Sequence, residues 1–140
     1  TARSRERTST MKLFDRQRNR RIGAEAEASA LDHLSRAGLR LVARNYRCRG
    51  GEIDLIMRDR QTLVFIEVRY RSGGRFASAA ESVDASKQRR ITTAAHHYLQ
   101  RQPQYRDLPC RFDVVAFDPA AQQGPALQPR WIQDAFHSTH

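Results

Sequence analysis

Three carboxylates interrupt two apolar stretches between residues 50 and 71, GGEIDLIMRDRQTLVFIEVRYR. They are Glu52, Asp54 and Glu67, and the residues around them are typical of β-strands. A buried carboxylate without a partner is costly, so each acid must be solvated, paired with a cation or bound to a metal ion. Carboxylate oxygens without nitrogen or sulfur ligands suit Mg²⁺ or Mn²⁺, so the chemistry that these residues offer is the binding of a hard divalent cation.

Strand geometry predicts how these acids meet. Side chains alternate between the two faces of a strand, so Glu52 and Asp54 share one face, as do Glu67 and Arg69 in the next strand. A turn centred on residues 60 and 61 places Asp54 opposite Glu67 and Glu52 opposite Arg69. Like charges in such positions destabilise a sheet, and a divalent cation between Asp54 and Glu67 would turn the repulsion into coordination. In the alternative interpretation Glu52 pairs with Arg69, and the other two acids are solvated near other arginines.

A lysine from a predicted helix is expected near the same place. The segment ASKQRRITTAAHHYLQR follows Asp84 and has an apolar stripe around Ile91 at helical spacing, and Lys87 falls within this stripe. We therefore expect Lys87 to face the sheet; the alternative is a side chain that extends along apolar surface and ends in solvent. Arg89 and Arg90 point elsewhere and are suited to phosphate contacts or to ordinary solvation.

The elements that must position these residues follow the order α-β-β-β-α-β, which indicates an α/β domain with a central mixed sheet flanked by helices. The expected elements are a helix over residues 23–37 that ends at Gly38, strands over 39–48, 51–58 and 62–71, a helix from Asp84 to Pro103 and a strand over 111–117. Residues 72–82 and 118–129, rich in Gly, Ser or Pro, are predicted loops, and 130–136 fits either a strand or a short helix.

The chain divides into a basic arm and one domain. Residues 1–22 carry eight basic and two acidic side chains, so we predict a flexible basic N-terminal arm, either adding affinity for phosphate or simply solvated. Residues 23–140 are then a single domain.

Charge and cysteine content narrow the class of partner and the compartment. The 140 residues include 25 basic and 15 acidic side chains, for a net charge of +10, and arginine predominates. This favours nucleic acid as partner, with an anionic membrane or mere solubility as alternatives. Cys48 and Cys110 form no CxxC or Cys/His pattern and are expected to be reduced thiols. Without a signal peptide or a spanning segment, the sequence predicts a cytoplasmic protein that does not interact with membranes.

Several separated motifs resemble, in the same order, those of the YraN-like family of bacterial proteins. They are Gly23, Glu27 and Leu34, then ARNYRCRGGEIDLI, LVFIEVRYR, SVDASKQRRI and CRFDVV. The resemblance runs from Gly23 to Phe136. It implies a restriction-endonuclease-like (PD-(D/E)XK) fold close to the Holliday-junction resolvases, and a Mg²⁺- or Mn²⁺-dependent endonuclease that acts on DNA, including branched DNA. Because such resolvases commonly act as symmetric dimers, it also implies a homodimer.

The resemblance assigns roles position by position. Asp54 and Glu67 match the two acids of the nuclease motif, and Glu27 matches the glutamate contributed by the first helix, so these three are the expected metal ligands. Glu52 matches the glutamate of the family's GEID motif, for which no role is assigned. Lys87 matches the family's lysine at the second helix.

Arg69 departs from the nuclease motif, which usually has lysine at this position. Arginine stays protonated and cannot act as a base, although it can neutralise charge on a phosphate. Lys87, if it faces the sheet, could supply the missing ammonium. The expected catalytic residues are Asp54, Glu67, Arg69 and Lys87, and the expected nucleic-acid contacts are Arg71, Arg75, Arg89 and Arg90. Arg69 also favours the alternative function, a nucleic-acid-binding protein on a nuclease-like scaffold that does not cut.

Overall fold

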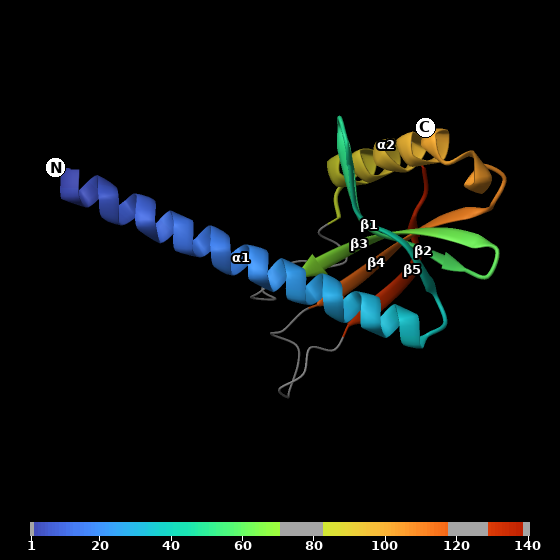
Figure 1. The fold of residues 1–140 in the computed structure, drawn as a ribbon, viewed down its shortest axis with the longest axis horizontal. Helices are drawn as coiled ribbons and strands as arrows, with labels where there is room; N and C mark the ends of the chain where they lie inside the picture. The colour runs from blue at the N-terminus through green and yellow to red at the C-terminus, as the bar shows by residue number, and fades with distance from the viewer. Residues whose placement is uncertain (1, 71–82, 118–128, 139–140) are drawn as a thin grey trace.

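A single mixed β-sheet forms the centre of the structure (Figure 1). The computed structural model describes residues 2–70, 83–117 and 129–138. Within these residues the sheet has five strands in chain order: β1 (Arg40–Cys48), β2 (Gly51–Asp59), β3 (Thr62–Tyr70), β4 (Cys110–Phe117) and β5 (Arg130–Phe136). Only β3 and β4 run parallel, and the other neighbours are antiparallel. The predicted α/β class and mixed sheet are therefore confirmed.

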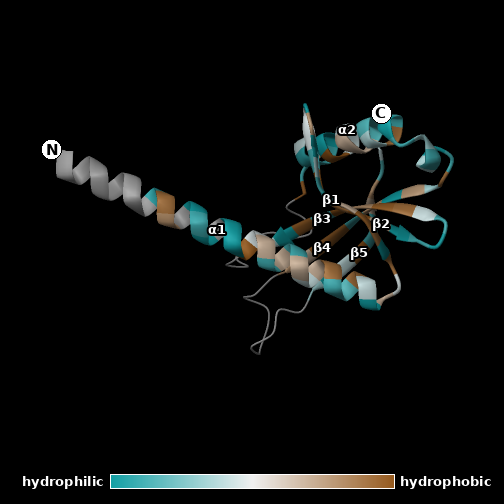
Figure 2. Cartoon of the chain, viewed as in Figure 1, coloured by the Kyte–Doolittle hydropathy of each residue, from teal (hydrophilic) through white to brown (hydrophobic). Residues whose placement is uncertain are grey.

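Two helices cover opposite faces of this sheet, α1 (Ala2–Arg36) and α2 (Ala85–Arg101), and a short 3₁₀ helix (Pro103–Tyr105) follows α2. The buried side chains of α1 pack against β2, β3 and β4 in one apolar cluster. Those of α2 pack against the other face in a second cluster. The strands between the helices have apolar residues on both faces, and Figure 2 shows their hydrophobic colour. Burial on both faces explains why β3 and β4 read as nearly continuous apolar runs.

Alternation within β3 shows how one strand supplies both clusters. Leu63 and Phe65 lie in the cluster on the α2 face, whereas Val64 and Ile66 lie in the cluster on the α1 face, and all four are almost fully buried. Glu67 continues the alternation on the side of Phe65. A carboxylate is thereby placed at the end of a buried apolar strand.

Helix α1 differs from the prediction at its beginning. A flexible arm was expected over residues 1–22, but Ala2 to Ile22 form one continuous helix with the rest of α1 and project beyond the sheet (Figure 1). The segment contains no proline or glycine before Gly23, and arginine is a good helix former, so nothing local ends the helix. The predicted end is confirmed, because α1 stops at Arg36 and Gly38 adopts a φ of 102°.

The remaining predicted elements are close to those observed. Asp84 caps α2 as predicted, accepting a hydrogen bond from the Lys87 backbone at 2.8 Å, and α2 ends before Pro103. Residues 130–136, left open between strand and helix, form strand β5. The predicted loop over 72–82, and residues 118–128 of the other, lie outside the described residues.

Strand β5 is held to β4 by a buried acid. Asp113 is fully buried and accepts hydrogen bonds from the Trp131 indole at 2.9 Å and from the Asp134 backbone at 2.9 Å. Arg111 pairs with Asp113 at 3.1 Å and with Asp59 at 2.9 Å. These partners satisfy the charge of Asp113, so this acid has a structural role.

Two smaller expectations concern the thiols and the membrane. Cys48 and Cys110 are both free, as expected. No helix in the described part of the chain has the length and apolar character needed to cross a membrane.

Candidate active site

The β2–β3 hairpin brings the first two acids together. Its five register pairs run from Leu55–Ile66 to Asp59–Thr62, which is the register predicted from the sequence. Asp54 and Glu67 lie one step beyond the last of these pairs. There the Asp54 carboxylate accepts a hydrogen bond of 2.8 Å from the Val68 backbone. The carboxylates of Asp54 and Glu67 are consequently neighbours at the point where the ladder ends.

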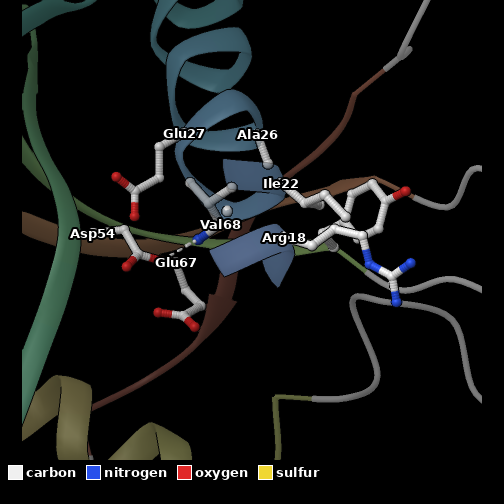
Figure 3. Close-up of a pocket in the computed structure, with 9 residues that line it drawn as sticks. Arg18, Ile22, Ala26, Glu27, Asp54, Glu67 and Val68 are labelled. Atoms are coloured by element: carbon white, nitrogen blue, oxygen red, sulfur yellow. Dashed lines mark hydrogen bonds between the residues drawn. The ribbon is translucent and has the colours of Figure 1, made fainter. Parts of the chain in front are cut away.

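The third acid, Glu27, comes from α1 and is positioned by an irregularity in β1. Asn45 has a φ of 50°, a left-handed conformation that asparagine tolerates better than most residues. With its amide nitrogen turned toward Glu27, Asn45 donates to both carboxylate oxygens, at 3.3 and 3.1 Å. Figure 3 shows the carboxylates of Glu27, Asp54 and Glu67 gathered on one side of a pocket.

Glu67 is the most deeply buried of the three. Its side chain is 3% exposed, and its Oε2 atom has no hydrogen-bond partner among the described residues. Burial, together with the charge of Asp54, raises the pKa of Glu67 to about 8, although Lys87 and Arg69 act in the opposite direction. Without a metal ion, Glu67 is therefore mostly protonated at neutral pH.

The pKa values of the other two acids are raised as well. For Asp54 the main cause is burial, partly offset by the hydrogen bond from Val68. For Glu27 burial is again the main cause, followed by the charge of Asp54, and Asn45 and Arg44 act in the opposite direction. All three carboxyl groups thus lie where negative charge is poorly stabilised by the protein itself.

Cations approach the acids from three elements, α2, β3 and β1. Lys87, in the first turn of α2, places its Nζ atom 3.5 Å from Glu67 and 3.6 Å from Glu52, and its side chain is only 23% exposed. Lys87 therefore faces the sheet, as the helical spacing predicted. Arg69 lies 3.7 Å from Glu67, while Arg47 lies 3.7 Å from Glu52.

These contacts contradict the alternative interpretation of the acids. Glu52 pairs with Lys87 and Arg47, whereas Arg69 pairs with Glu67 on its own strand. Glu67 is buried and not solvated. The reason is the close approach of β2 to α2, since a Cβ atom built on Gly51 would lie 2.0 Å from the carbonyl oxygen of residue 90. This approach places Glu52 beside the first turn of α2, where its carboxylate lies 3.6 Å from Lys87.

A pocket of about 670 Å³ opens beside the acids. Glu27, Asp54 and Glu67 line one side, and the helical segment around Arg18 and Ile22 lines another. In Figure 3 the guanidinium of Arg18 points away from the carboxylates. The pocket is thus acidic in its interior and has a basic side chain at its border. We call it the acidic pocket.

The donor set of the acidic pocket fits a hard divalent cation. All three groups are carboxylates, and the Glu67 oxygen without a partner is the kind of atom that a cation would satisfy. Among the residues that the structure describes, no three His, Cys, Asp or Glu side chains are close enough to form a ready-made metal site. A bound cation would therefore have to draw the carboxylates together.

The predicted nucleic-acid contacts divide into two groups. Arg89 and Arg90 are exposed on α2, close to the start of β2. Arg71 and Arg75 lie outside the described residues.

Asn45 belongs to the site but was not predicted; an asparagine inside an otherwise regular strand pattern is the only sequence signal for its left-handed conformation.

Fold and site define the class of protein: an α/β protein with a restriction-endonuclease-like arrangement, in which a helix and a hairpin bring acids to the end of a mixed sheet. The chain belongs to the uncharacterised protein family UPF0102, whose model matches residues 26–117. The resemblance to the YraN-like family is thereby confirmed.

Several UPF0102 proteins are similar to this chain over most of their length. The protein of Pseudomonas entomophila (strain L48) is 52% identical over 114 residues, which cover 81% of this chain and 91% of that protein. The protein of Nitrosococcus oceani is 53% identical over 114 residues, with 81% and 90% covered. The protein of Alcanivorax borkumensis is 49% identical over 116 residues, with 83% and 91% covered.

Proposed function

We propose that this protein is a metal-dependent endonuclease that hydrolyses phosphodiester bonds in DNA, including branched DNA. The observation that carries the proposal is the buried Glu67 carboxyl group, which has one oxygen without a partner and lies beside Asp54. Buried polar atoms are normally hydrogen-bonded, so an oxygen without a partner among the described residues is the kind of atom that a bound cation would satisfy. The positive net charge supports a polyanionic substrate.

In the proposed reaction, Glu27, Asp54 and Glu67 would hold Mg²⁺ or Mn²⁺. When bound, such an ion polarises the scissile phosphate and lowers the pKa of a water molecule. The Glu67 carboxyl gives up its proton on binding the ion. Lys87 and Arg69 then supply positive charge beside the acids, where it stabilises the negative charge that develops on the phosphate.

A cleavage screen tests this function. Linear, flapped and four-way DNA, with RNA counterparts, are incubated with the protein and either Mg²⁺ or Mn²⁺. We expect Glu67→Ala to abolish metal-dependent cleavage and leave binding largely intact, because Glu67 is a ligand inside the pocket. Glu25→Ala, at an exposed acid of the same helix as Glu27, is the matched control and should cut normally. Equal cleavage by wild type and Glu67→Ala would place the activity elsewhere.

The second candidate is a nucleic-acid-binding protein that does not cut. Arginine at position 69 favours this function, since lysine is usual there in the nuclease motif. Calorimetric titration with Mn²⁺ distinguishes the two candidates. A carboxylate-dependent site that is lost in Glu67→Ala supports the nuclease, and the absence of any site would leave only the binding function.

A further inference from the structure

Arginines surround a second concavity at the other end of the sheet. Gly38, Arg40, Arg58 and Arg60 line a space of about 480 Å³ between the end of α1, the start of β1 and the β2–β3 turn. None of these residues lines the acidic pocket. We call this second site the arginine pocket.

The charge of the arginine pocket is not neutralised by the described parts of the chain. Arg40 and Arg58 are register partners across β1 and β2, an arrangement of like charges that destabilises a sheet. No described carboxylate forms an ion pair with either of them or with Arg60. Asp59, the acid nearest in sequence, pairs instead with Arg111 at 2.9 Å. The pocket therefore presents positive charge to a ligand.

The backbone and the turn hold this arrangement in place. The Arg58 guanidinium donates to the Arg60 carbonyl at 3.0 Å and to the Gln61 side chain at 3.3 Å. Arg60 has a φ of 56°, where glycine or asparagine would be less strained. Gly38 leaves the pocket open, since an added Cβ atom there would meet nothing within 4 Å. The two-residue β2–β3 turn requires this conformation, and it fixes the exposed side chain of Arg60 at the border of the pocket.

We propose that the arginine pocket binds a phosphate of the nucleic-acid backbone, at a point separate from the acidic pocket. Arg58 follows Asp54 by four residues on β2, which is a distance of about 13 Å along a strand. This corresponds to roughly four nucleotides at about 3.4 Å per nucleotide of duplex axis. Arg44, exposed on the edge strand β1, lies between Arg40 and the acidic pocket, where it lowers the pKa of Glu27. One nucleic-acid molecule can thus contact both pockets.

This inference deepens the proposed function and rests on it, so its test uses DNA binding without metal as well as metal binding. The variant Arg40→Gln/Arg58→Gln/Arg60→Gln is compared with a control that removes the same charge elsewhere, Arg36→Gln/Arg101→Gln/Arg106→Gln. Affinity for duplex and four-way DNA is measured by fluorescence anisotropy at several salt concentrations. We expect the pocket variant to bind DNA at least about tenfold more weakly. The slope of log affinity against log salt concentration, the salt slope, should become shallower by about one unit. The control should stay within about threefold.

A single substitution separates charge from folding. Arg60→Asn removes the guanidinium and keeps a residue that tolerates the left-handed conformation. We expect Arg60→Asn to be at least as stable as wild type and to bind DNA more weakly. If the triple variant does not fold, this single variant still tests whether the arginine pocket binds DNA.

Two further measurements distinguish failure of this site from failure of the nuclease. In calorimetric titration the pocket variant should bind Mn²⁺ as tightly as wild type does, because none of its substitutions lies in the acidic pocket. Titration with pyrophosphate should shift the NMR signals of residues 58 to 60. Equal DNA affinity of the two triple variants, or no shifts at these residues, would contradict phosphate binding at the arginine pocket. Shifts at these residues without any DNA binding by wild type would show that the arginine pocket binds free phosphate compounds. That result would contradict both the proposed contact with a nucleic-acid phosphate and the proposed nuclease function.

Discussion

Glu67 shows how the surroundings of one residue determine its chemistry. Its carboxyl group is buried beside Asp54, and two cations at 3.5 and 3.7 Å do not offset the cost of its charge. In the metal-free protein it therefore keeps a proton at neutral pH. Binding of a divalent cation would replace that proton, so metal affinity and protonation must be linked.

The first prediction is the pH dependence of stability. The pKa of Glu67 rises from its ordinary value near 4.5 to about 8 on folding. Its contribution to stability is thus fully present below about pH 4.5 and is lost as the pH rises toward 8. Glutamine does not titrate, so the stability of Glu67→Gln relative to wild type should increase by at least about 1.4 kcal/mol between pH 5 and 8. Urea denaturation at several pH values measures this difference.

Metal ions provide the control for that experiment. At pH 8, Mn²⁺ should raise the melting temperature of wild type and have little effect on Glu67→Gln, because amide oxygen is a weaker ligand than carboxylate. A stability difference that does not change with pH would show that Glu67 is ionised throughout.

The second prediction concerns which cation serves the reaction. Lys87 lies closer to Glu67 than Arg69 does and approaches from a different element. At saturating Mn²⁺, Lys87→Met should lower the single-turnover cleavage rate at least about 100-fold, which corresponds to about 2.7 kcal/mol. Arg69→Lys keeps a positive charge and should stay within about threefold of wild type. The reverse result, with Lys87→Met active and Arg69→Met inactive, would show that Arg69 is the cation that stabilises the negative charge on the phosphate.

At the scale of elements, the close contact between β2 and α2 positions Glu52 and Lys87. Gly51 permits this contact, since its added Cβ atom would lie 2.0 Å from a backbone oxygen and 3.2 Å from the Ala94 side chain. We predict that Gly51→Ala lowers the free energy of unfolding by at least about 2 kcal/mol, as overpacking does. Denaturation with urea measures the effect.

Gly23→Ala is the matched control for this third prediction. Gly23 lies within α1, and its added Cβ atom would meet nothing within 4 Å. Alanine is the better helix former, so this variant should be more stable by up to about 1 kcal/mol. A Gly51→Ala variant as stable as wild type would contradict the prediction. It would mean that the hairpin and α2 can move apart at no cost in free energy.

How far the sequence predicts these elements depends on the range of the contacts involved. The β2–β3 register was predictable because a two-residue turn determines it, and the orientation of Lys87 followed from helical spacing. The contact at Gly51 and the burial of Asp113 depend on residues distant in the chain, and no local pattern indicates them. The acids of the acidic pocket were predictable only in part. The hairpin register places Asp54 beside Glu67, whereas only the family resemblance indicated that Glu27 joins them.

At the scale of the whole molecule, positive charge extends well beyond the acidic pocket. The projecting part of α1 carries exposed Lys12, Arg16 and Arg20, and the arginine pocket lies at the far end of the sheet. Among the α1 residues whose burial the structure describes, the buried ones begin at Ala26, and none before it belongs to the described core. The charge of Lys12, Arg16 and Arg20 can therefore be changed without removing a contact of the described core.

The last prediction follows from this separation of charge and core. Deleting residues 1–17 removes five basic and two acidic side chains and leaves Arg18 at the acidic pocket. We expect the unfolding free energy to change by no more than about 0.5 kcal/mol. DNA affinity should fall, and the salt slope should become shallower by at least about one unit, because fewer phosphates are neutralised. Anisotropy titrations across a salt series measure both quantities.

A full-length control separates the charge of this segment from its length. In it, the five basic residues Arg3, Arg5, Arg7, Lys12 and Arg16 are replaced by glutamine, which is also a good helix former. Equal losses of affinity in the deletion and in this control would show that charge is responsible. A deletion that binds DNA with the wild-type affinity and salt slope would restrict the nucleic-acid interface to the sheet, α2 and the rest of α1.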